Sequence, residues 1–300
     1  MSELKIGMIG LDTSHCEAFV NLLHDSDNPH HVPGGRVIGA YPGGSQQVSV
    51  SRDRVASFTK TLNEKHGIPI FSSIEDLAMG CDAFLLESVD GRQHLGQFQL
   101  LSNFGKPVFI DKPFACSYAD AQAIADLGKK KNIPVMSASA IRFAAGMAGL
   151  APPGAKVMSC EVAGPINILP DYPAYFWYGV HCADVLYSYL GKGCVQVRVA
   201  HAEATDLLTG TWQGARMGCV RGVRTGPAKF NCAVFTDKGI IRSEAKDEPP
   251  AYGLMLKEIV KFFQAGKSPI DIEETVEVMA YLEAAGQSLE AGGKPVMLPR

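Results

Sequence analysis

The sequence predicts an α/β protein of two domains, the first built on a parallel sheet and the second an α+β domain with a mostly antiparallel sheet. In roughly the first 140 residues, short apolar runs alternate with helical patterns, which indicates parallel strands joined by helices. Longer β-rich runs follow after about Arg142. A chain of 300 residues is also long enough for about two domains. We therefore expect one domain over residues 1–141 and a second over residues 142–300.

Apolar runs, and apolar residues at helical spacing, predict the elements of the first domain in chain order. Ser73 is a suitable N-cap for a short helix, and the lysines at 129–131 suit the last turn of a longer one, because the helix dipole favours positive charge there. The expected strands are residues 5–11, 36–40, 83–88, 107–111 and 133–138, and the expected helices are residues 17–24, 48–66, 73–76, 93–103 and 118–131.

The second domain is expected to contain strands separated by turn signals, together with three helices. Thr236–Gly239 is typical of a hairpin turn, and Gly292 and Gly293 are expected to end the closing helix. The expected strands are residues 155–163, 194–204, 211–220 and 229–235, and the expected helices are residues 178–190, 252–264 and, closing the domain, 273–290.

The composition excludes several classes of partner. A net charge of −3 gives no reason to expect nucleic acid, and no run approaches the ~20 apolar residues of a membrane helix. Residues Met1–Lys5 lead into an apolar strand without the features of a signal peptide, so we expect a cytoplasmic protein. The eight cysteines include no Cys-x-x-Cys pair, which indicates reduced, mostly buried thiols and predicts no metal site.

The segment Gly10–His15 lies between the first expected strand and the first expected helix, where a Rossmann-type domain holds the pyrophosphate of a dinucleotide. The fingerprint there is Gly-x-Gly-x-x-Gly, but Asp12 and His15 replace its second and third glycines. Thr13 and Ser14 are able to cap the helix or donate hydrogen bonds to a phosphate. Two alternatives stay open. Asp12 or Thr13 merely caps the helix, or a pyrophosphate binds to Gly10, Leu11, Thr13, Ser14 and His15.

No acidic residue follows the second expected strand, where an aspartate or glutamate would bind the ribose of NAD. Residues 42–45 are instead Pro-Gly-Gly-Ser, and Arg52 follows. Ser45 and Arg52 would leave room for a 2′-phosphate and so favour NADP, although Arg52 is equally suited to a solvated helix face.

The run Gly105–Ala115 places Asp111-Lys112-Pro113 at the end of an expected strand. A lysine at the carboxyl edge of a parallel sheet can contact both a nicotinamide and a substrate hydroxyl, and an X-Pro bond there can be cis. A Lys-Pro pair alone is more often an ordinary turn. The whole run, however, resembles the Glu-Lys-Pro motif of the Gfo/Idh/MocA family of NAD(P)-dependent sugar and polyol oxidoreductases.

Other segments extend this resemblance along the chain. Leu85–His94 looks like the family's Thr-Pro-Asn-x-x-His run, with His94 in the histidine position. Gly67–Leu77 resembles its third β-α unit, and residues 274–296 resemble its closing helix and strand.

Residues 177–184 resemble the family's Asp-x-Gly-x-His-x-x-Asp pattern. Gly179, His181 and Asp184 match it, but Trp177 replaces the first aspartate. His181 and Asp184 are three residues apart, so they share a helix face and could contact one ligand.

The resemblance implies NAD or NADP as cofactor and Lys112 and His181 as catalytic residues. Beyond the first turn, it implies cofactor contacts from Ser88, His94, Asp111 and Pro113. Substrate contacts are expected from Arg142, Trp177, Tyr178 and Asp184. Simpler alternatives remain for this last group. The two aromatics could belong to a core, Arg142 could pair with a surface acid, and Asp184 could orient another side chain or be a charge on the helix surface.

The implied activity is hydride transfer between the nicotinamide and a small sugar-like or polyol-like molecule. Lys112 or His181 would take the hydroxyl proton as general base, and the two are expected to face one another across an interdomain cleft. The antiparallel sheet could pair face to face in a homo-oligomer, a dimer or tetramer, as in the family.

Two other functions remain open. One is a non-redox binding or regulatory protein that kept the fold but lost the cofactor site. The other is a lyase or hydrolase that uses His15, His94 and His181, with or without a metal.

Overall fold

The computed structural model describes residues 3–299, which form two compact units. The first unit contains the residues up to Ala138 together with Tyr252–Ile272, and the second contains Ser139–Ala251 and the residues from Glu273 on. The structure thus differs from two consecutive domains, because residues 252–272 belong to the first unit. Periodicity within the chain predicts that a helix forms there, but not which core it joins.

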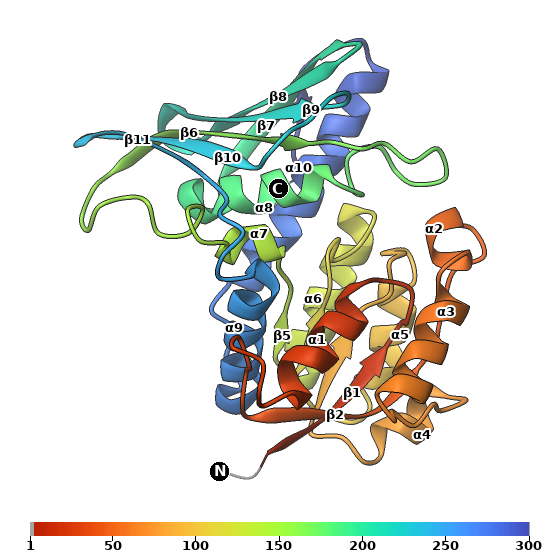
Figure 1. Cartoon of the computed structure of the whole chain (residues 1–300). Helices are drawn as coiled ribbons and strands as arrows, with labels where there is room; N and C mark the ends of the chain where they lie inside the picture. Colours follow the sequence, from red (N-terminus) through yellow and green to blue (C-terminus); the bar gives the residue numbers. More distant parts are fainter. Residues whose placement is uncertain (1–2, 300) are drawn as a thin grey trace. The chain divides into compact units, whose positions relative to one another are not determined.

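A five-stranded parallel sheet with strand order β2-β1-β3-β4-β5 forms the centre of the first unit (Figure 1). Every residue of β3 and β4 is buried, which requires cover on both faces and explains their uninterrupted apolar sequences. The strands are β1 (Leu4–Ile9), β2 (Gly35–Tyr41), β3 (Ala83–Leu86), β4 (Val108–Ile110) and β5 (Val135–Met136).

Eight helical segments belong to the first unit. Ser73 caps α4 by accepting a hydrogen bond from Asp76 N, and three lysines occupy the last turn of α6, as the sequence predicted. The segments are α1 (His15–His24), α2 (Ser49–Arg52), α3 (Val55–Lys60), the π-helical turn η1 (Thr61–Lys65), α4 (Ile74–Ala78), α5 (His94–Leu101), α6 (Tyr118–Lys131) and α9 (Ala251–Ala265).

The single helix expected over residues 48–66 is divided into α2, α3 and η1. The Ser51 hydroxyl in α2 accepts a hydrogen bond from Ser45 N and donates one to the Asp12 carboxylate. The bond to Asp12 attaches α2 to the turn after β1, and the periodic pattern carries no sign of it.

A seven-stranded sheet, with strand order β11-β10-β6-β9-β8-β7-β12, forms the second unit. Its pairs are antiparallel except β6 with β9, which confirms the expected mostly antiparallel sheet. The strands are β6 (Val157–Pro165), β7 (Cys194–Ala202), β8 (Thr205–Trp212), β9 (Arg216–Val223), β10 (Asn231–Thr236), β11 (Gly239–Glu244) and β12 (Val296–Met297).

The expected strand at residues 211–220 is a hairpin rather than one strand. The chain turns between β8 and β9 at residues 213–215, where Gly214 (φ 72°) and Ala215 (φ 59°) are left-handed. The strands before and after this turn alternate buried and less buried residues, as a sheet with one covered face requires.

Three helices complete the second unit, namely α7 (Ala140–Phe143), α8 (Gly179–Leu190) and α10 (Ile272–Glu290). Tyr187 of α8 and Tyr281 of α10 both pack against Trp212 of β8, with ring centroids 5.3 and 6.1 Å away. Both helices therefore lie on the same face of the sheet. Gly218 of β9 makes room for this cluster, since a Cβ there would lie 2.7 Å from the Trp212 ring.

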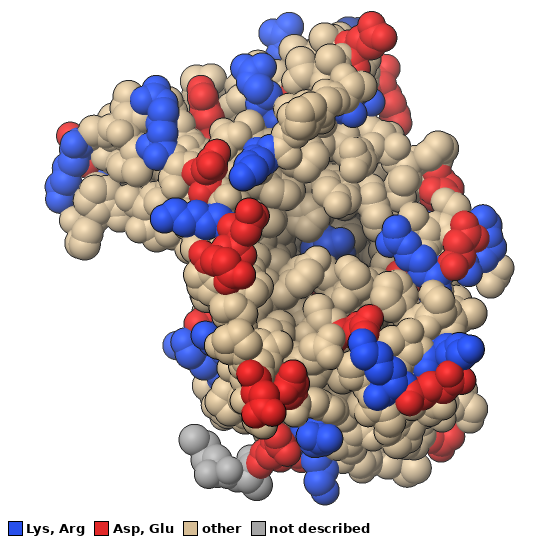
Figure 2. Space-filling model, viewed as in Figure 1, with Lys and Arg blue, Asp and Glu red and all other residues tan. Residues whose placement is uncertain are grey.

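On the face drawn in Figure 2, basic and acidic side chains are interspersed rather than gathered by sign. None of the helices within residues 3–299 combines the length and apolarity needed to span a bilayer. The eight cysteines form no disulfide among the described residues, and six of them are buried.

Candidate functional site

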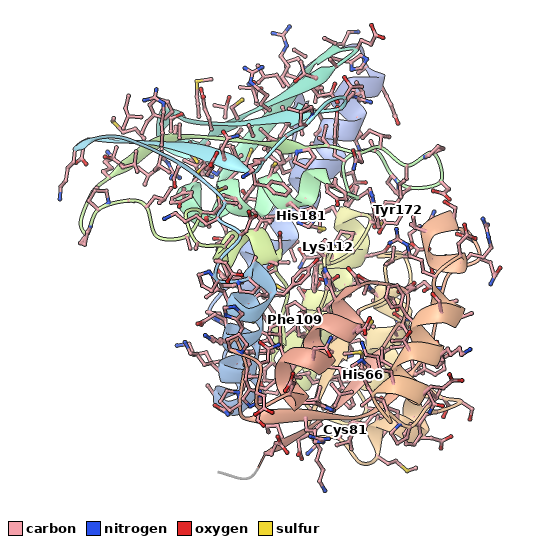
Figure 3. The ribbon with its side chains drawn as sticks, in the orientation of Figure 1. His66, Cys81, Phe109, Lys112, Tyr172 and His181 are labelled. Atoms are coloured by element: carbon pink, nitrogen blue, oxygen red, sulfur yellow. The ribbon has the colours of Figure 1, made fainter. Side chains whose placement is uncertain are left out.

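Lys112 lies at the carboxyl edge of the parallel sheet, where open α/β sheets bind ligands. Phe109 is inside β4, Lys112 follows the strand's end, and Cys81 lies toward the opposite edge (Figure 3). Only 9% of Lys112 is exposed, and the Lys112–Pro113 bond is cis. Lys112 therefore lies where the sequence predicted it, directly after the end of a parallel strand.

Gly10, the remaining fingerprint glycine, occupies a position that requires glycine. Its φ is +86°, and a Cβ would lie 2.4 Å from Ser88 N and Oγ at the end of β3. The next residue, Leu11, is buried and donates its N–H to Pro42 O at 2.7 Å. The turn is thus packed closely between the segments that follow β2 and β3.

Asp12, at the second glycine position, is fully buried. Its carboxylate accepts hydrogen bonds from Ser51 Oγ at 2.5 Å and from Val89 N at 3.0 Å. Burial raises the pKa of Asp12, although these bonds favour its charged form. The carboxylate therefore joins three segments of the chain, and the interpretation of Asp12 as the cap of α1 is wrong.

The N-cap of α1 is Ser14, which is exposed and makes no capping bond with its side chain. Thr13 is buried, and its Oγ1 accepts a long hydrogen bond of 3.4 Å from His15 N. Ser14 is consequently the residue of this turn whose side chain reaches the surface.

His15, at the third glycine position, lies against the ends of β3 and β4. Its Nδ1 is 3.0 Å from Asp111 Oδ2 and 3.5 Å from Glu87 Oε2. The His15 ring also packs on the Tyr252 ring of α9 at 4.6 Å. Glu87 was not predicted as a site residue. Its only signal is an acidic residue directly after the apolar strand Ala83–Leu86.

The charges of this cluster depend on one another. Burial opposes a charge on His15, but the Asp111 and Glu87 carboxylates outweigh burial and raise the pKa of His15 to about 9. Burial and then the neighbouring Asp111 charge raise the pKa of Glu87 to about 7. Asp111 is also buried, but the charge of His15 lowers its pKa.

His94 holds two segments together from the interior. It is fully buried, with Nε2 2.7 Å from Ser88 O and Nδ1 3.2 Å from Phe114 O. Both ring nitrogens therefore face backbone carbonyls, and the cofactor contact expected of His94 stays a prediction.

The two residues considered for a 2′-phosphate both have other partners. Ser45 is buried, and its hydroxyl donates to Asp90 at 2.7 Å, while Arg92 pairs with the same carboxylate. Arg52 is half-exposed and pairs with the neighbouring Asp53 at 3.2 Å.

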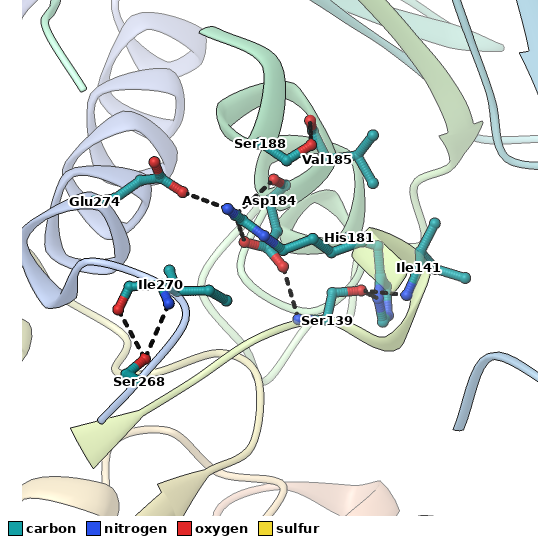
Figure 4. A network of polar contacts seen from close by, with 10 residues as sticks. Ser139, Ile141, His181, Asp184, Val185, Ser188, Ser268, Ile270 and Glu274 are labelled. Carbon is teal, nitrogen blue, oxygen red and sulfur yellow. Dashed lines mark hydrogen bonds and ion pairs between the residues drawn. The ribbon is translucent and has the colours of Figure 1, made fainter. Parts of the chain in front are cut away.

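In the second unit, His181 belongs to a polar network around the start of α8 (Figure 4). Its Nδ1 lies 2.7 Å from Ser139 Oγ. Ser139 N donates to Asp184 Oδ2 at 2.8 Å. The same Asp184 carboxylate accepts from Arg142, whose second nitrogen donates to Glu274 at 2.7 Å.

This network includes two of the residues expected to contact a substrate. The Arg142 side chain is 13% exposed and that of Asp184 is 10% exposed, and they form an ion pair at 2.9 Å. These charges raise the pKa of Arg142 above its usual value, although burial opposes this. Arg142 therefore pairs with two carboxylates, those of Asp184 and Glu274, and a substrate contact by Arg142 or Asp184 stays a prediction.

Trp177 and Tyr178 form part of an aromatic group beside His181. The Tyr178 ring meets the His181 ring edge-on at 5.2 Å, and Trp177 packs on Tyr178 and on Tyr172 at 6.0 and 5.7 Å. Phe230 lies on His181 as well, at 5.6 Å. Where the family pattern has an acid, His181 thus has aromatic neighbours and Ser139.

Part of the chain is similar in sequence to known proteins. Residues 4–139 match the sequence model of GFO_IDH_MocA, described as an oxidoreductase family with an NAD-binding Rossmann fold. A Salmonella typhimurium protein with the provisional name oxidoreductase YceM is 29% identical over 144 residues, or 48% of this chain. The match spans 41% of that relative's length.

Solved structures resemble the fold over nearly the whole length of the chain. The myo-inositol dehydrogenase of Lactobacillus casei, solved with NAD(H) and myo-inositol, has a TM-score of 0.78 at 15% identity and covers 100% of this chain and 98% of its own. The myo-inositol 2-dehydrogenase of Lactobacillus plantarum has a TM-score of 0.75 at 15% identity, covering 99% of this chain and 100% of its own. At such identities the likeness establishes the fold.

The tripeptide Asp111-Lys112-Pro113 thus follows β4 of a Rossmann-type sheet, within the residues that match a family model of oxidoreductases with an NAD-binding fold. Residues 4–139, a little under half of the chain, are therefore similar to the Gfo/Idh/MocA family of oxidoreductases.

The residues at the sheet edge fit such a cofactor in part. The buried Oγ of Ser88 and the Oε1 atoms of Gln93 and Gln97 have no hydrogen-bond partner in the described structure, and Gly10 leaves a space that a Cβ would fill. Groups of a dinucleotide could satisfy these atoms. The first turn offers less than a full fingerprint, because Leu11 N is already bonded and Asp12 is already used.

Proposed function

We propose that the protein transfers a hydride between a nicotinamide dinucleotide and a small hydroxyl compound of the sugar or polyol class. The observation that carries the proposal is Lys112, a nearly buried lysine at the carboxyl edge of an NAD-binding Rossmann sheet. The unpartnered Ser88 Oγ at the end of the neighbouring strand supports it. When bound, the nicotinamide supplies the hydride chemistry.

The chain's own groups would manage the proton and the charge. As a hydroxyl carbon is oxidised, its oxygen loses a proton while negative charge develops on it. Lys112 is assigned to this oxygen, as the general base or as the cation that stabilises the charge. His181 is assigned as a second group for proton transfer, with Ser139 holding its Nδ1.

The preferred dinucleotide is proposed to be NADP. The segment Pro42–Ser45 after β2 contains no carboxylate that would bind a ribose 2′-hydroxyl and repel a 2′-phosphate. The nearby Asp90 carboxylate is paired with Arg92.

The test is a calorimetric titration of the pure protein with NAD⁺, NADH, NADP⁺ and NADPH, followed by turnover assays on a panel of polyols including myo-inositol. We expect binding of at least one dinucleotide and reduction of the oxidised form by a polyol. Lys112→Met should keep dinucleotide binding and lose turnover. If no dinucleotide binds, the non-redox alternative is favoured instead.

A further inference from the structure

One imidazole and two carboxylates meet inside the first unit, where α1 begins and where β3 and β4 end. The potential ligand atoms of His15, Glu87 and Asp111 all lie within 4.8 Å of one another. Their side chains are 6%, 0% and 2% exposed. The cluster is therefore screened from water, which normally compensates such groups.

The side chains of this cluster approach one another closely, but their contacts do not have the geometry of hydrogen bonds. His15 Nδ1, both carboxylate oxygens of Glu87 and Asp111 Oδ1 have no hydrogen-bond partner among the described residues. A buried polar atom without a partner costs about 1–3 kcal/mol, and a charged one costs more. Glu87 is the clearest case, since it is fully buried and neither of its oxygens has a hydrogen-bond donor.

The spacing suits a small cation. Zinc binds histidine nitrogen and carboxylate oxygen at about 2.0–2.2 Å, so neighbouring ligand atoms of a tetrahedral site lie roughly 3.3–3.6 Å apart. The separations from His15 Nδ1 to the two carboxylates, 3.0 and 3.5 Å, are close to this range. Three protein ligands with a fourth position for water or substrate is the pattern of catalytic zinc sites.

We propose that His15, Glu87 and Asp111 bind one divalent transition-metal ion of the zinc class. The imidazole favours such a metal over magnesium or calcium, which prefer oxygen ligands. A neutral imidazole and two carboxylates would balance the charge of the ion.

This site goes beyond the proposed function and does not depend on it. It assigns His15 and Asp111 to an ion rather than to a pyrophosphate. It also explains why an acid follows β3 and a histidine replaces a fingerprint glycine.

The test uses the full chain, stripped with a chelator and titrated with Zn²⁺ by calorimetry, with elemental analysis after gel filtration. We expect one Zn²⁺ per chain and no comparable binding of Mg²⁺. Glu87→Gln and Asp111→Asn should weaken Zn²⁺ binding by about 100-fold or more, since loss of a direct ligand exceeds the effect of an outer partner. Glu17→Gln is the matched control, because it removes a carboxylate that pairs with His66 elsewhere in the same unit. The Glu17→Gln variant should bind Zn²⁺ with the affinity of the wild type.

Substitution with Co²⁺ identifies the ligands independently. Visible d–d bands without a thiolate charge-transfer band are expected, and they should disappear in His15→Gly, which restores a fingerprint glycine. Circular dichroism checks that each variant is folded. The proposal is overturned if the folded wild-type protein binds no Zn²⁺, if the folded variants bind it as well as the wild type, or if a thiolate band appears. Should the carboxylate variants fail to fold, the wild-type titration and the His15→Gly spectrum decide the question.

Discussion

Ser139 Oγ lies 2.7 Å from His181 Nδ1, so the serine hydroxyl holds one nitrogen of this ring. Ser139 is itself held in place. It caps α7 by accepting from Ile141 N, and its own N–H donates to Asp184. A serine thus fixes the orientation of a histidine whose familial acidic partner is replaced by Trp177.

Loss of this contact should reduce turnover more than binding. We expect Ser139→Ala to lower kcat by about 10-fold or more with little change in KM, because a misoriented imidazole transfers protons poorly. Ser139→Thr, which keeps the hydroxyl, should restore most of the rate. The ¹⁵N chemical shifts of the His181 ring should change in the alanine variant, and unchanged shifts would contradict a positioning role.

The ion pairs of Arg142 should matter for stability. Arg142→Met leaves the Asp184 and Glu274 carboxylates without their common cation, and we expect a loss of about 3–5 kcal/mol in the free energy of unfolding. Arg52→Met is the control, since it removes only an exposed pair and should cost less than about 1 kcal/mol. Denaturant unfolding followed by circular dichroism compares the two. If the two variants lost the same free energy of unfolding, the ion pairs of Arg142 would stabilise the fold no more than the exposed pair of Arg52.

Restoring the second fingerprint glycine should not improve the cofactor site. Asp12→Gly removes the acceptor for Ser51 Oγ and Val89 N, and we expect a loss of about 1–3 kcal/mol in stability. Dinucleotide affinity should stay the same or fall, because the carboxylate already has partners within the chain. Calorimetry on the folded variant provides the measurement, and tighter binding would show that the carboxylate opposes the phosphates.

The stability of the first unit should depend on the protonation of His24. Its Nε2 accepts a hydrogen bond from Val37 N, and burial, with the nearby Arg36 charge, lowers its pKa to about 4. The unfolded chain binds this proton near pH 6.5, so the stabilising contribution is present above that pH and is lost as the pH falls toward 4. Because His24 is only half-buried, the slope should be less than about 1.4 kcal/mol per pH unit.

The variant His24→Gln keeps an acceptor for Val37 N but does not titrate. Its free energy of unfolding should change less between pH 6.5 and 4 than that of the wild type, while the two should agree at pH 8. Parallel pH curves for the two proteins would exclude His24 as the source of the dependence.

The sequence predicted those parts of the fold that depend on local pattern. The apolar runs located all five parallel strands, and residues 118–131 form the predicted helix because its cap and its lysines lie within the helix or next to it. The hairpin turn at residues 213–215 was missed, since neither Gly214 nor Ala215 interrupts an apolar pattern. Strand β11 was missed as well, because its residues are mostly exposed and follow no clear alternation.

The site was harder to predict because its contacts are distant in sequence. Lys112 was located through a contiguous motif, whereas Glu274, a partner of Arg142, lies 132 residues away from it. Glu87 belongs to no motif and is recognisable only once β3 and α1 are placed together. Local pattern therefore located the lysine at the carboxyl edge of the sheet, and three-dimensional packing decided which charged residues pair with each other.

The place of α9 in the first unit has a consequence for protein synthesis. Tyr252 of this helix packs on the rings of His15 and Phe19, yet it is made more than 100 residues after the parallel sheet is complete. Domains generally fold as units as the chain emerges from the ribosome. The nascent first unit must therefore wait for most of the second to be translated before His15 is covered, and a fragment ending near residue 141 would expose that surface permanently.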